Sequence, residues 1–202
     1  MNTAIFGIVS LKLGIHMKRV VLILVSIFSL VFAQEYDFRS SSWGMTKQEV
    51  ISHEKLKLIY NKSNHLGYMS KISGLKTSVL YTFSKNHLSS AGYMFREKHS
   101  NKNDYINDYE YIKKVLIDKY GQPIVDEKVW RNDLYKNDYQ NYGLAVSIGH
   151  LRYDTQWETD KTKISLDLLG DNYKISMIVK YKAKALINSV KKERLKDEGK
   201  NF

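Results

Sequence analysis

The 202-residue chain contains no cysteine, and its only proline is Pro123. Without cysteine the protein has no disulfides, no thiol nucleophile and no cysteine-ligated metal ion. Long apolar runs are also missing, because the apolar stretch Val20–Ala33 is interrupted by Ser26 and Ser29 and is shorter than the roughly 20 residues of a membrane-spanning helix. Neither a Gly-X-Ser-X-Gly elbow nor a closely spaced histidine pair occurs. No motif therefore specifies a reaction.

The stretch Met17–Ala33 has the parts of a cleavable signal peptide. Lys18 and Arg19 form a positive start, an apolar segment follows, and Ala33 places a small residue before the cleavage point. We expect cleavage between Ala33 and Gln34 and an exported protein, either periplasmic or secreted. The alternative is a retained membrane anchor, for which the apolar segment is short.

The position of the signal peptide determines how the rest of the chain is divided. Residues 1–16 fit no part of a signal peptide, and their simplest explanation is a start assigned too early, with Met17 as the initiator. The alternative is a long positive start that includes Lys12. Residues 34–181 are expected to form a single α+β domain, and residues 182–202 a basic C-terminal helix or tail.

The formal net charge of the whole chain is +11, and much of the excess lies in the tail. We expect no nucleic-acid partner, because the rest of the chain is only mildly basic and the protein is exported. A basic amphipathic helix is predicted at 183–196, and it would suit an anionic membrane surface. The alternative is a solvated terminal helix that binds nothing.

The first helix of the domain has the most specific local signal. Thr46 and Glu49 have the spacing of a capping box, in which each side chain satisfies an unpaired backbone amide. Met45 and Val50 occupy the hydrophobic-staple positions around it. The sequence predicts a helix from Thr46 to about Glu54.

Alternating apolar residues predict strands in both halves of the chain. The first set comprises Leu56–Tyr60, Leu66–Ile72, Leu75–Ser84 and Leu88–Glu97. The second set comprises Val129–Arg131, Leu144–Ile148, Leu151–Trp157, Ile164–Leu169 and Tyr173–Tyr181. Between the sets, a helix is predicted at Asn103–Tyr120, ended by Gly121 and Pro123.

The two halves therefore share an order of one helix followed by a meander. Aligning Thr77 with Thr162 also places equivalent apolar positions together: Val79 with Ile164, Tyr81 with Leu166 and Phe83 with Leu168, and Asn86 then falls on Asp171. This match suggests an internal duplication. The expected fold class is α+β, with helices packed on one face of a mostly antiparallel sheet.

The opening segment Phe38–Val50 contains Trp43-Gly44-Met45-Thr46 before a helix that starts Gln48-Glu49-Val50. It resembles the start of many exported bacterial proteins, and it is similar to the small outer-membrane assembly lipoproteins of the SmpA/OmlA type. That resemblance implies the architecture of β-lactamase inhibitor proteins, with paired helices on an antiparallel sheet, and protein binding without catalysis. The chain departs from the family in having no lipid-bearing cysteine.

Tyrosine is unusually common, with fifteen in the chain. Tyr135, Tyr139 and Tyr142 lie in a stretch that mixes aromatic rings with amides and charges, which is typical of recognition surfaces. Together with Trp157 they are the predicted binding residues. The alternative is that these rings complete the core.

Carboxylates near Trp157 are the other candidates. Asp154, Glu158 and Asp160 could supply oxygen ligands to calcium, although Lys161 and Lys163 are nearer charge partners and we expect no metal ion or other cofactor. The preferred function is therefore a non-enzymatic envelope protein that binds another protein or a surface polymer. The alternative is a hydrolase of envelope carbohydrate or peptide that uses dispersed carboxylates such as Asp154 and Glu158.

Overall fold

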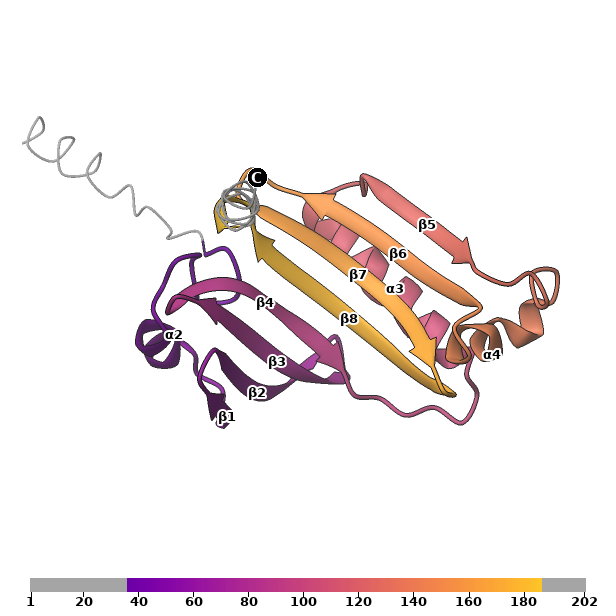
Figure 1. Cartoon of the computed structure of the whole chain (residues 1–202), viewed down its shortest axis with the longest axis horizontal. Helices are drawn as coiled ribbons and strands as arrows, with labels where there is room; N and C mark the ends of the chain where they lie inside the picture. Colours follow the sequence, from indigo (N-terminus) through magenta and orange to yellow (C-terminus); the bar gives the residue numbers. More distant parts are fainter. Residues whose placement is uncertain (1–35, 187–202) are drawn as a thin grey trace, which may run out of the picture. The chain divides into compact units, whose positions relative to one another are not determined.

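The computed structural model describes residues 36–186, which contain one open, antiparallel, eight-stranded sheet. Its strands lie side by side in the order β1-β2-β3-β4-β8-β7-β6-β5 (Figure 1). The first half of the chain supplies β1 (Leu58–Lys62), β2 (His65–Ile72), β3 (Leu75–Ser84) and β4 (His87–Phe95). The second half supplies β5 (Val125–Trp130), β6 (Leu151–Glu158), β7 (Thr162–Asp171) and β8 (Lys174–Ala183). The predicted fold class is confirmed.

The helices α2 (Lys47–His53), α3 (Asp104–Tyr120) and α4 (Tyr142–Ser147) pack on one face of this sheet. Helix α3 contacts β7 and β8, lying behind them in Figure 1, and α4 contacts β6, β7 and β8. Helix α2 ends at His53, and the carboxylate of its C-cap residue Glu54 accepts a hydrogen bond from the Tyr81 hydroxyl of β3. We call this side the covered face and the opposite side the helix-free face.

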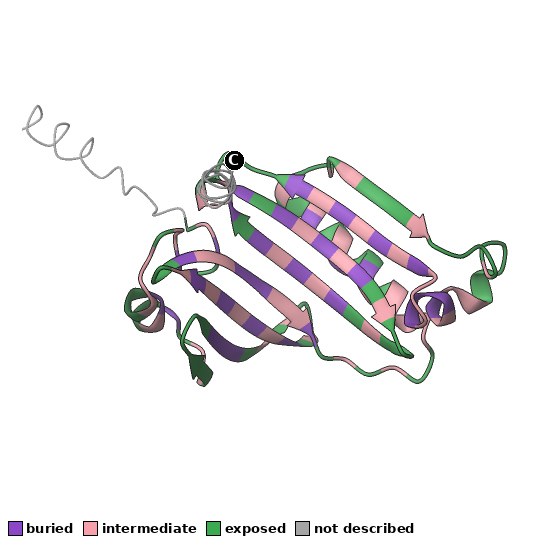
Figure 2. Cartoon of the chain, in the orientation of Figure 1, coloured by how far each residue is buried: buried purple, intermediate pink, exposed green. Residues whose placement is uncertain are grey.

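The core lies between the helices and the covered face. Along β3, β6 and β7, buried and more exposed residues alternate, which gives the stripes of Figure 2. On β3 the buried residues are Thr77, Val79, Tyr81 and Phe83. Alternation with a period of two buries one side of each strand and leaves the other side on the helix-free face.

Each half contains an initial helix and four strands, and β4 pairs with β8 at the junction, but in the second half α4 lies between β5 and the last three strands. The aligned pairs Thr77 and Thr162, and Val79 and Ile164, occupy buried positions on the third strands of the two halves. The following turns are offset by two residues: positive φ angles occur at Lys85 and Asn86, which the alignment places on residues 170 and 171, but in the second half they occur at Asn172 and Tyr173. The repeat therefore holds along the strands and shifts at the hairpin.

The capping box at the start of α2 is confirmed. Thr46 Oγ1 accepts a hydrogen bond from the Glu49 amide at 3.3 Å, and Glu49 Oε2 accepts one from the Thr46 amide at 2.7 Å. The staple residue Val50 is fully buried in the core. Both partners of the box are close in sequence, so local physics sets this helix start.

Replacing Thr46 with alanine is expected to lower the free energy of unfolding by about 1 kcal/mol, because the amide of Glu49 loses its acceptor. Urea unfolding of the variant and of a neighbouring Lys47→Ala control would measure this. An unchanged midpoint for Thr46→Ala would mean that the cap contributes nothing to stability.

The boundaries of the remaining elements follow the sequence closely, with one error. Helix α3 ends at Tyr120, and Gly121 then adopts a φ of 81°, which favours glycine. The edge strand β1 lies two residues further along the chain than the predicted strand Leu56–Tyr60. The other edge strand, β5, begins four residues before the predicted strand Val129–Arg131. Of the predicted terminal helix at 183–196, the structure describes a helical start at residues 184–186, and residues 187–202 lie outside the described part.

The predicted strand Leu144–Ile148 is wrong, because these residues belong largely to α4. Apolar residues alternate there, but Gly143, Ala145 and Ser147 between them are buried as well. Gly143 lets the helix approach the start of α3 so closely that a Cβ atom would lie 2.3 Å from the Lys102 carbonyl carbon. A short apolar run fits either structure, and here tertiary packing selects the helix.

Candidate binding surface on the helix-free face

None of the helices in the described part of the chain has the length and apolar character required to cross a membrane.

The candidate site is the helix-free face of the sheet, which α2, α3 and α4 leave uncovered. Cross-strand register places Leu80, Gly92, Lys180, Ser165 and Gln156 in one row across this face. The row crosses from the first half of the chain to the second without interruption. Side chains from both halves therefore contribute to one surface.

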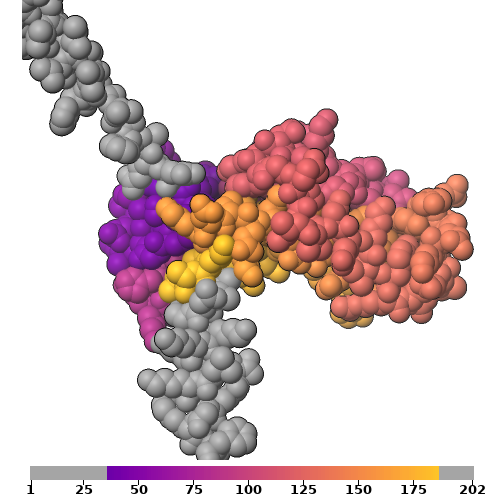
Figure 3. Space-filling view, turned by 90° about the horizontal axis from the view of Figure 1, so that it is seen from above, coloured from indigo at the N-terminus to yellow at the C-terminus, as the bar shows by residue number. Residues whose placement is uncertain are grey.

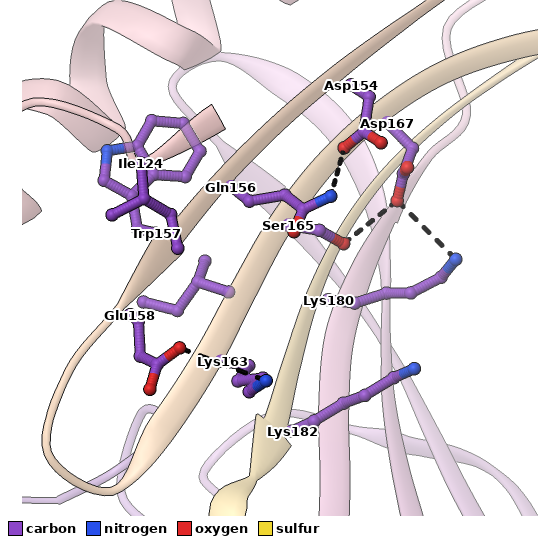
Figure 4. Close-up of a pocket in the computed structure, with 11 residues that line it drawn as sticks. Ile124, Asp154, Gln156, Trp157, Glu158, Lys163, Ser165, Asp167, Lys180 and Lys182 are labelled. Carbon is purple, nitrogen blue, oxygen red and sulfur yellow. Dashed lines mark hydrogen bonds and ion pairs between the residues drawn. The ribbon is translucent and has the colours of Figure 1, made fainter. Parts of the chain in front are cut away.

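A shallow groove of about 330 Å³ lies on the second-half side of this face. Figure 4 shows its polar lining side chains projecting from β6, β7 and β8. These residues are Asp154, Gln156, Glu158, Lys163, Ser165, Asp167, Lys180 and Lys182, with Ile124 at the edge. The groove is polar and open, unlike the enclosed apolar cavities that bind small molecules.

The acidic side chains of the groove are bound by neighbouring residues. Asp167 accepts a hydrogen bond from Ser165 Oγ at 3.0 Å and lies 3.6 Å from Lys180 Nζ. Asp154 accepts one from Gln156 Nε2 at 2.9 Å. These contacts hold the carboxylates in fixed positions as hydrogen-bond acceptors.

Glu158 is held in the same way at the other end of the groove. Its carboxylate lies 2.6 Å from Lys184 Nζ and 4.0 Å from Lys163 Nζ. The hydrogen bond from Lys184 lowers the pKa of Glu158 below its usual value. A general acid at neutral pH needs a raised pKa, so Glu158 has the wrong electrostatics for that role.

The three carboxylates that were considered as calcium ligands do not lie on one element. Asp154 and Glu158 lie on β6, but Asp160 follows in the turn to β7. Within residues 36–186, no three histidine or acidic side chains are grouped so that they could hold a metal ion. Lys163 does pair with Glu158, as its position suggested.

The first-half side of the helix-free face has a different character. The five adjacent strands β1, β2, β3, β4 and β8 contain no aspartate or glutamate. At their centre Leu80, Met94 and Ile178 are partly exposed, and Met94 lies directly opposite Ile178. Met69 on β2 is 46% exposed. This surface combines apolar groups with lysines and lacks carboxylates.

The predicted tyrosines gather at one end of the sheet. The rings of Trp130, Tyr142 and Tyr139 form a chain with centroid separations of 5.1 and 5.0 Å, and Tyr139 is 76% exposed. Tyr135 lies 6.2 Å from the ring of His150. In Figure 3 this region, salmon to orange, lies far from the indigo residues. Tyr139 is thus exposed beside Tyr142, whereas Tyr135 and Tyr142 are partly buried and pack against the core. The three tyrosines stay a predicted binding site.

Trp157, the fourth predicted residue, is not part of that cluster. Its side chain is buried in the core, and its indole nitrogen donates a hydrogen bond to the Gly121 carbonyl at 2.9 Å. It lies near the opposite end of β6 from the tyrosines. Because an odd-numbered β6 residue faces the helices, Trp157 ties the end of α3 to the sheet. It is also among the residues that line the groove described above, although it is only 2% exposed, and its binding role stays a prediction (Figure 4).

A buried polar cluster lies on the covered face beside α2. The Arg39 guanidinium donates to Glu54 from Nε at 2.8 Å, and the Tyr81 hydroxyl donates to the same carboxylate at 2.6 Å. The side chain of Glu54 is 1% exposed. Burial acts to raise the pKa of Glu54, but the hydrogen bonds from Arg39, Tyr81 and the Leu56 amide outweigh it and lower the pKa.

Sequence reasoning did not single out Lys180, Lys182, Ser165 or Asp167. They occupy the outward positions of β7 and β8, alternating with buried residues such as Val179 and Tyr181. That alternation was visible in the sequence, as was the lack of acids in five strands. Their assembly into one surface depends on the pairing of β4 with β8, which no local pattern specifies.

No family model, curated protein or solved structure matches the chain.

Proposed function

We propose that the protein is a non-enzymatic exported binding protein whose helix-free face docks another protein or a surface polymer. The observation that carries this proposal is the gathering of α2, α3 and α4 on the covered face, which leaves a continuous sheet surface beside a filled core. Rigid strands hold partly exposed side chains of this surface in place, as a pre-organised interface requires.

The alternative hydrolase is less well supported by the groove. Asp154, Asp167 and Glu158 each accept a hydrogen bond or ion pair from a neighbouring side chain. The lowered pKa of Glu158 opposes a role as proton donor. An open, shallow groove also leaves the reacting bond of a bound substrate in contact with water, whereas catalysis gains when water is excluded.

Site-specific photo-crosslinking in the producing cell tests the binding surface. A crosslinking amino acid at Thr82 or Ser165 on the helix-free face is expected to give discrete adducts. The same residue at Lys114, an exposed position on α3, serves as the control. Adducts from Lys114 alone, or none from either face position, would contradict the proposed docking surface.

Export is tested separately. We expect the mature protein in periplasm or medium to begin at Gln34, since Ala33 supplies the small residue before the cut. Intact mass and N-terminal sequencing would measure this. An Ala33→Asp variant is expected to remain uncleaved and so to retain the apolar segment Val20–Phe32. Recovered protein that still starts at Met1 or Met17 in the wild type would contradict the export part of the proposal.

A further inference from the structure

Charge is unevenly distributed over the helix-free face. Its outward positions on β8 include Lys180 and Lys182, and those on β2 and β3 include Lys71 and Lys76. The acids of the face lie instead on β5, β6 and β7. Lys182 is exposed and has no ion pair among the described residues. The five adjacent strands thus carry cations and no carboxylate of their own. Lys180 pairs with Asp167 of the neighbouring strand β7 at 3.6 Å, so a partner carboxylate would bind Lys182 directly and share Lys180 with Asp167.

The apolar groups of the same surface lie at its centre. Leu80, Met94 and Ile178 are on the inner strands β3, β4 and β8. Next to Leu80 in the row stand Gly67 and Gly92, which raise no side chain above the sheet. Both glycines are buried, because the Tyr60 and Leu80 side chains lie over Gly67 and the β8 backbone lies against Gly92. The apolar contact of this surface is therefore made by Leu80, Met94 and Ile178 themselves.

We propose that this surface binds an acidic segment of a partner protein, with an apolar side chain against Leu80, Met94 and Ile178 and carboxylates against Lys180 and Lys182. The inference rests on the proposed function and specifies its ligand. Complementary charge sets the orientation of such a segment, and the apolar anchor supplies buried area. Methionine side chains adapt their shape to an anchor at modest cost.

A protein segment fits the surface better than a bilayer or a glycan does. The central apolar groups Leu80, Met94 and Ile178 are only partly exposed, so they offer little apolar area for insertion into lipid. The centre of the face also carries no aromatic ring, since Tyr60 is at the edge strand β1. Stacking on sugar rings therefore has no platform there.

Methionine-methyl NMR provides a direct test, because the methionines report on both faces. Met69 and Met94 lie on the helix-free face, whereas Met177 is 3% exposed on the covered face. The probes are a short peptide of glutamates and aspartates around a central Leu-Met pair, the same peptide with lysine replacing every acid, and phosphatidylglycerol vesicles. We expect the acidic peptide to shift Met94 and Met69, to leave Met177 in place, and to bind more weakly in high salt.

The double variant Lys180→Glu/Lys182→Glu is expected to weaken acidic-peptide binding about tenfold, and Lys114→Glu to leave it unchanged. An unmoved Met177 signal shows that the double variant is folded. The inference would be overturned if the lysine peptide shifted the Met94 signal as much as the acidic peptide does, or if vesicles shifted the Met94 signal and the acidic peptide did not. If crosslinks from Thr82 and Ser165 persist unchanged in the double variant, the acidic ligand is wrong while the docking surface stands.

Discussion

Replacing Arg39 with alanine is expected to lower the free energy of unfolding by about 3–5 kcal/mol, because it leaves the buried carboxylate of Glu54 without its cation. Arg39 bonds both oxygens of Glu54, from Nε at 2.8 Å and from its terminal nitrogen at 3.2 Å. The backbone at Arg39 has a φ of 53°, and alanine has the same strain there. The loss therefore reports on the ion pair and not on the backbone.

Chemical denaturation would measure this change. Lys136→Ala, which breaks an exposed pair with Asp133, is the matched control and is expected to fall within error. The double variant Arg39→Met/Glu54→Met should recover much of the lost stability, since it removes both buried charges. If Arg39→Ala unfolds at the wild-type midpoint, the ion pair does not stabilise the fold.

The pH dependence of this variant has a defined sign. In the wild type the pKa of Glu54 lies below its usual value, so its stabilising contribution is present above about pH 4.3 and is lost as the pH falls through the lowered pKa. In Arg39→Ala, burial raises the pKa of Glu54, and the unpaired charge costs most at neutral pH. The stability difference between the two proteins should therefore narrow toward acid.

Replacing Gly92 with alanine is expected to cost about 3 kcal/mol, at the upper end for overpacking. Gly92 lies on β4 at the junction of the two halves, and a Cβ atom there would be 2.4 Å from the Val179 carbonyl oxygen on β8. That oxygen belongs to the backbone, so the added methyl group can be accommodated only if the two central strands separate.

Gly67→Ala is the matched control, because it adds the same group on the same face. There the methyl group would lie 3.0 Å from Tyr60 Cβ, a milder contact than at Gly92, and it could be relieved by a small shift of the edge strand β1, which has a neighbour on one side only. Thermal unfolding should show a much larger fall in midpoint for Gly92→Ala than for Gly67→Ala. Equal shifts would mean that the junction is no more tightly packed than the edge.

Much of the fold could be predicted because its signals are local. The capping box needs only Thr46 and Glu49, and the alternation on β3 needs only the strand itself. Helix α4 was missed because its conformation depends on Gly143 packing against a distant turn. A sheet face could be expected as a binding surface, but its residues could not be named for the same physical reason: Met94 and Ile178 meet only through a pairing far apart in sequence.

The junction of β4 with β8 also has a consequence for how the chain reaches its native state. Strand β4 contains no lysine, arginine, aspartate or glutamate, so it lacks the charges that protect exposed edges. Its partner β8 is the last strand to be synthesised. Until β8 arrives, the first half presents an unprotected edge that could pair with another copy of itself. In the full-length chain β8 pairs with β4 and covers this edge, so the second half of the chain protects the first half from aggregation during folding.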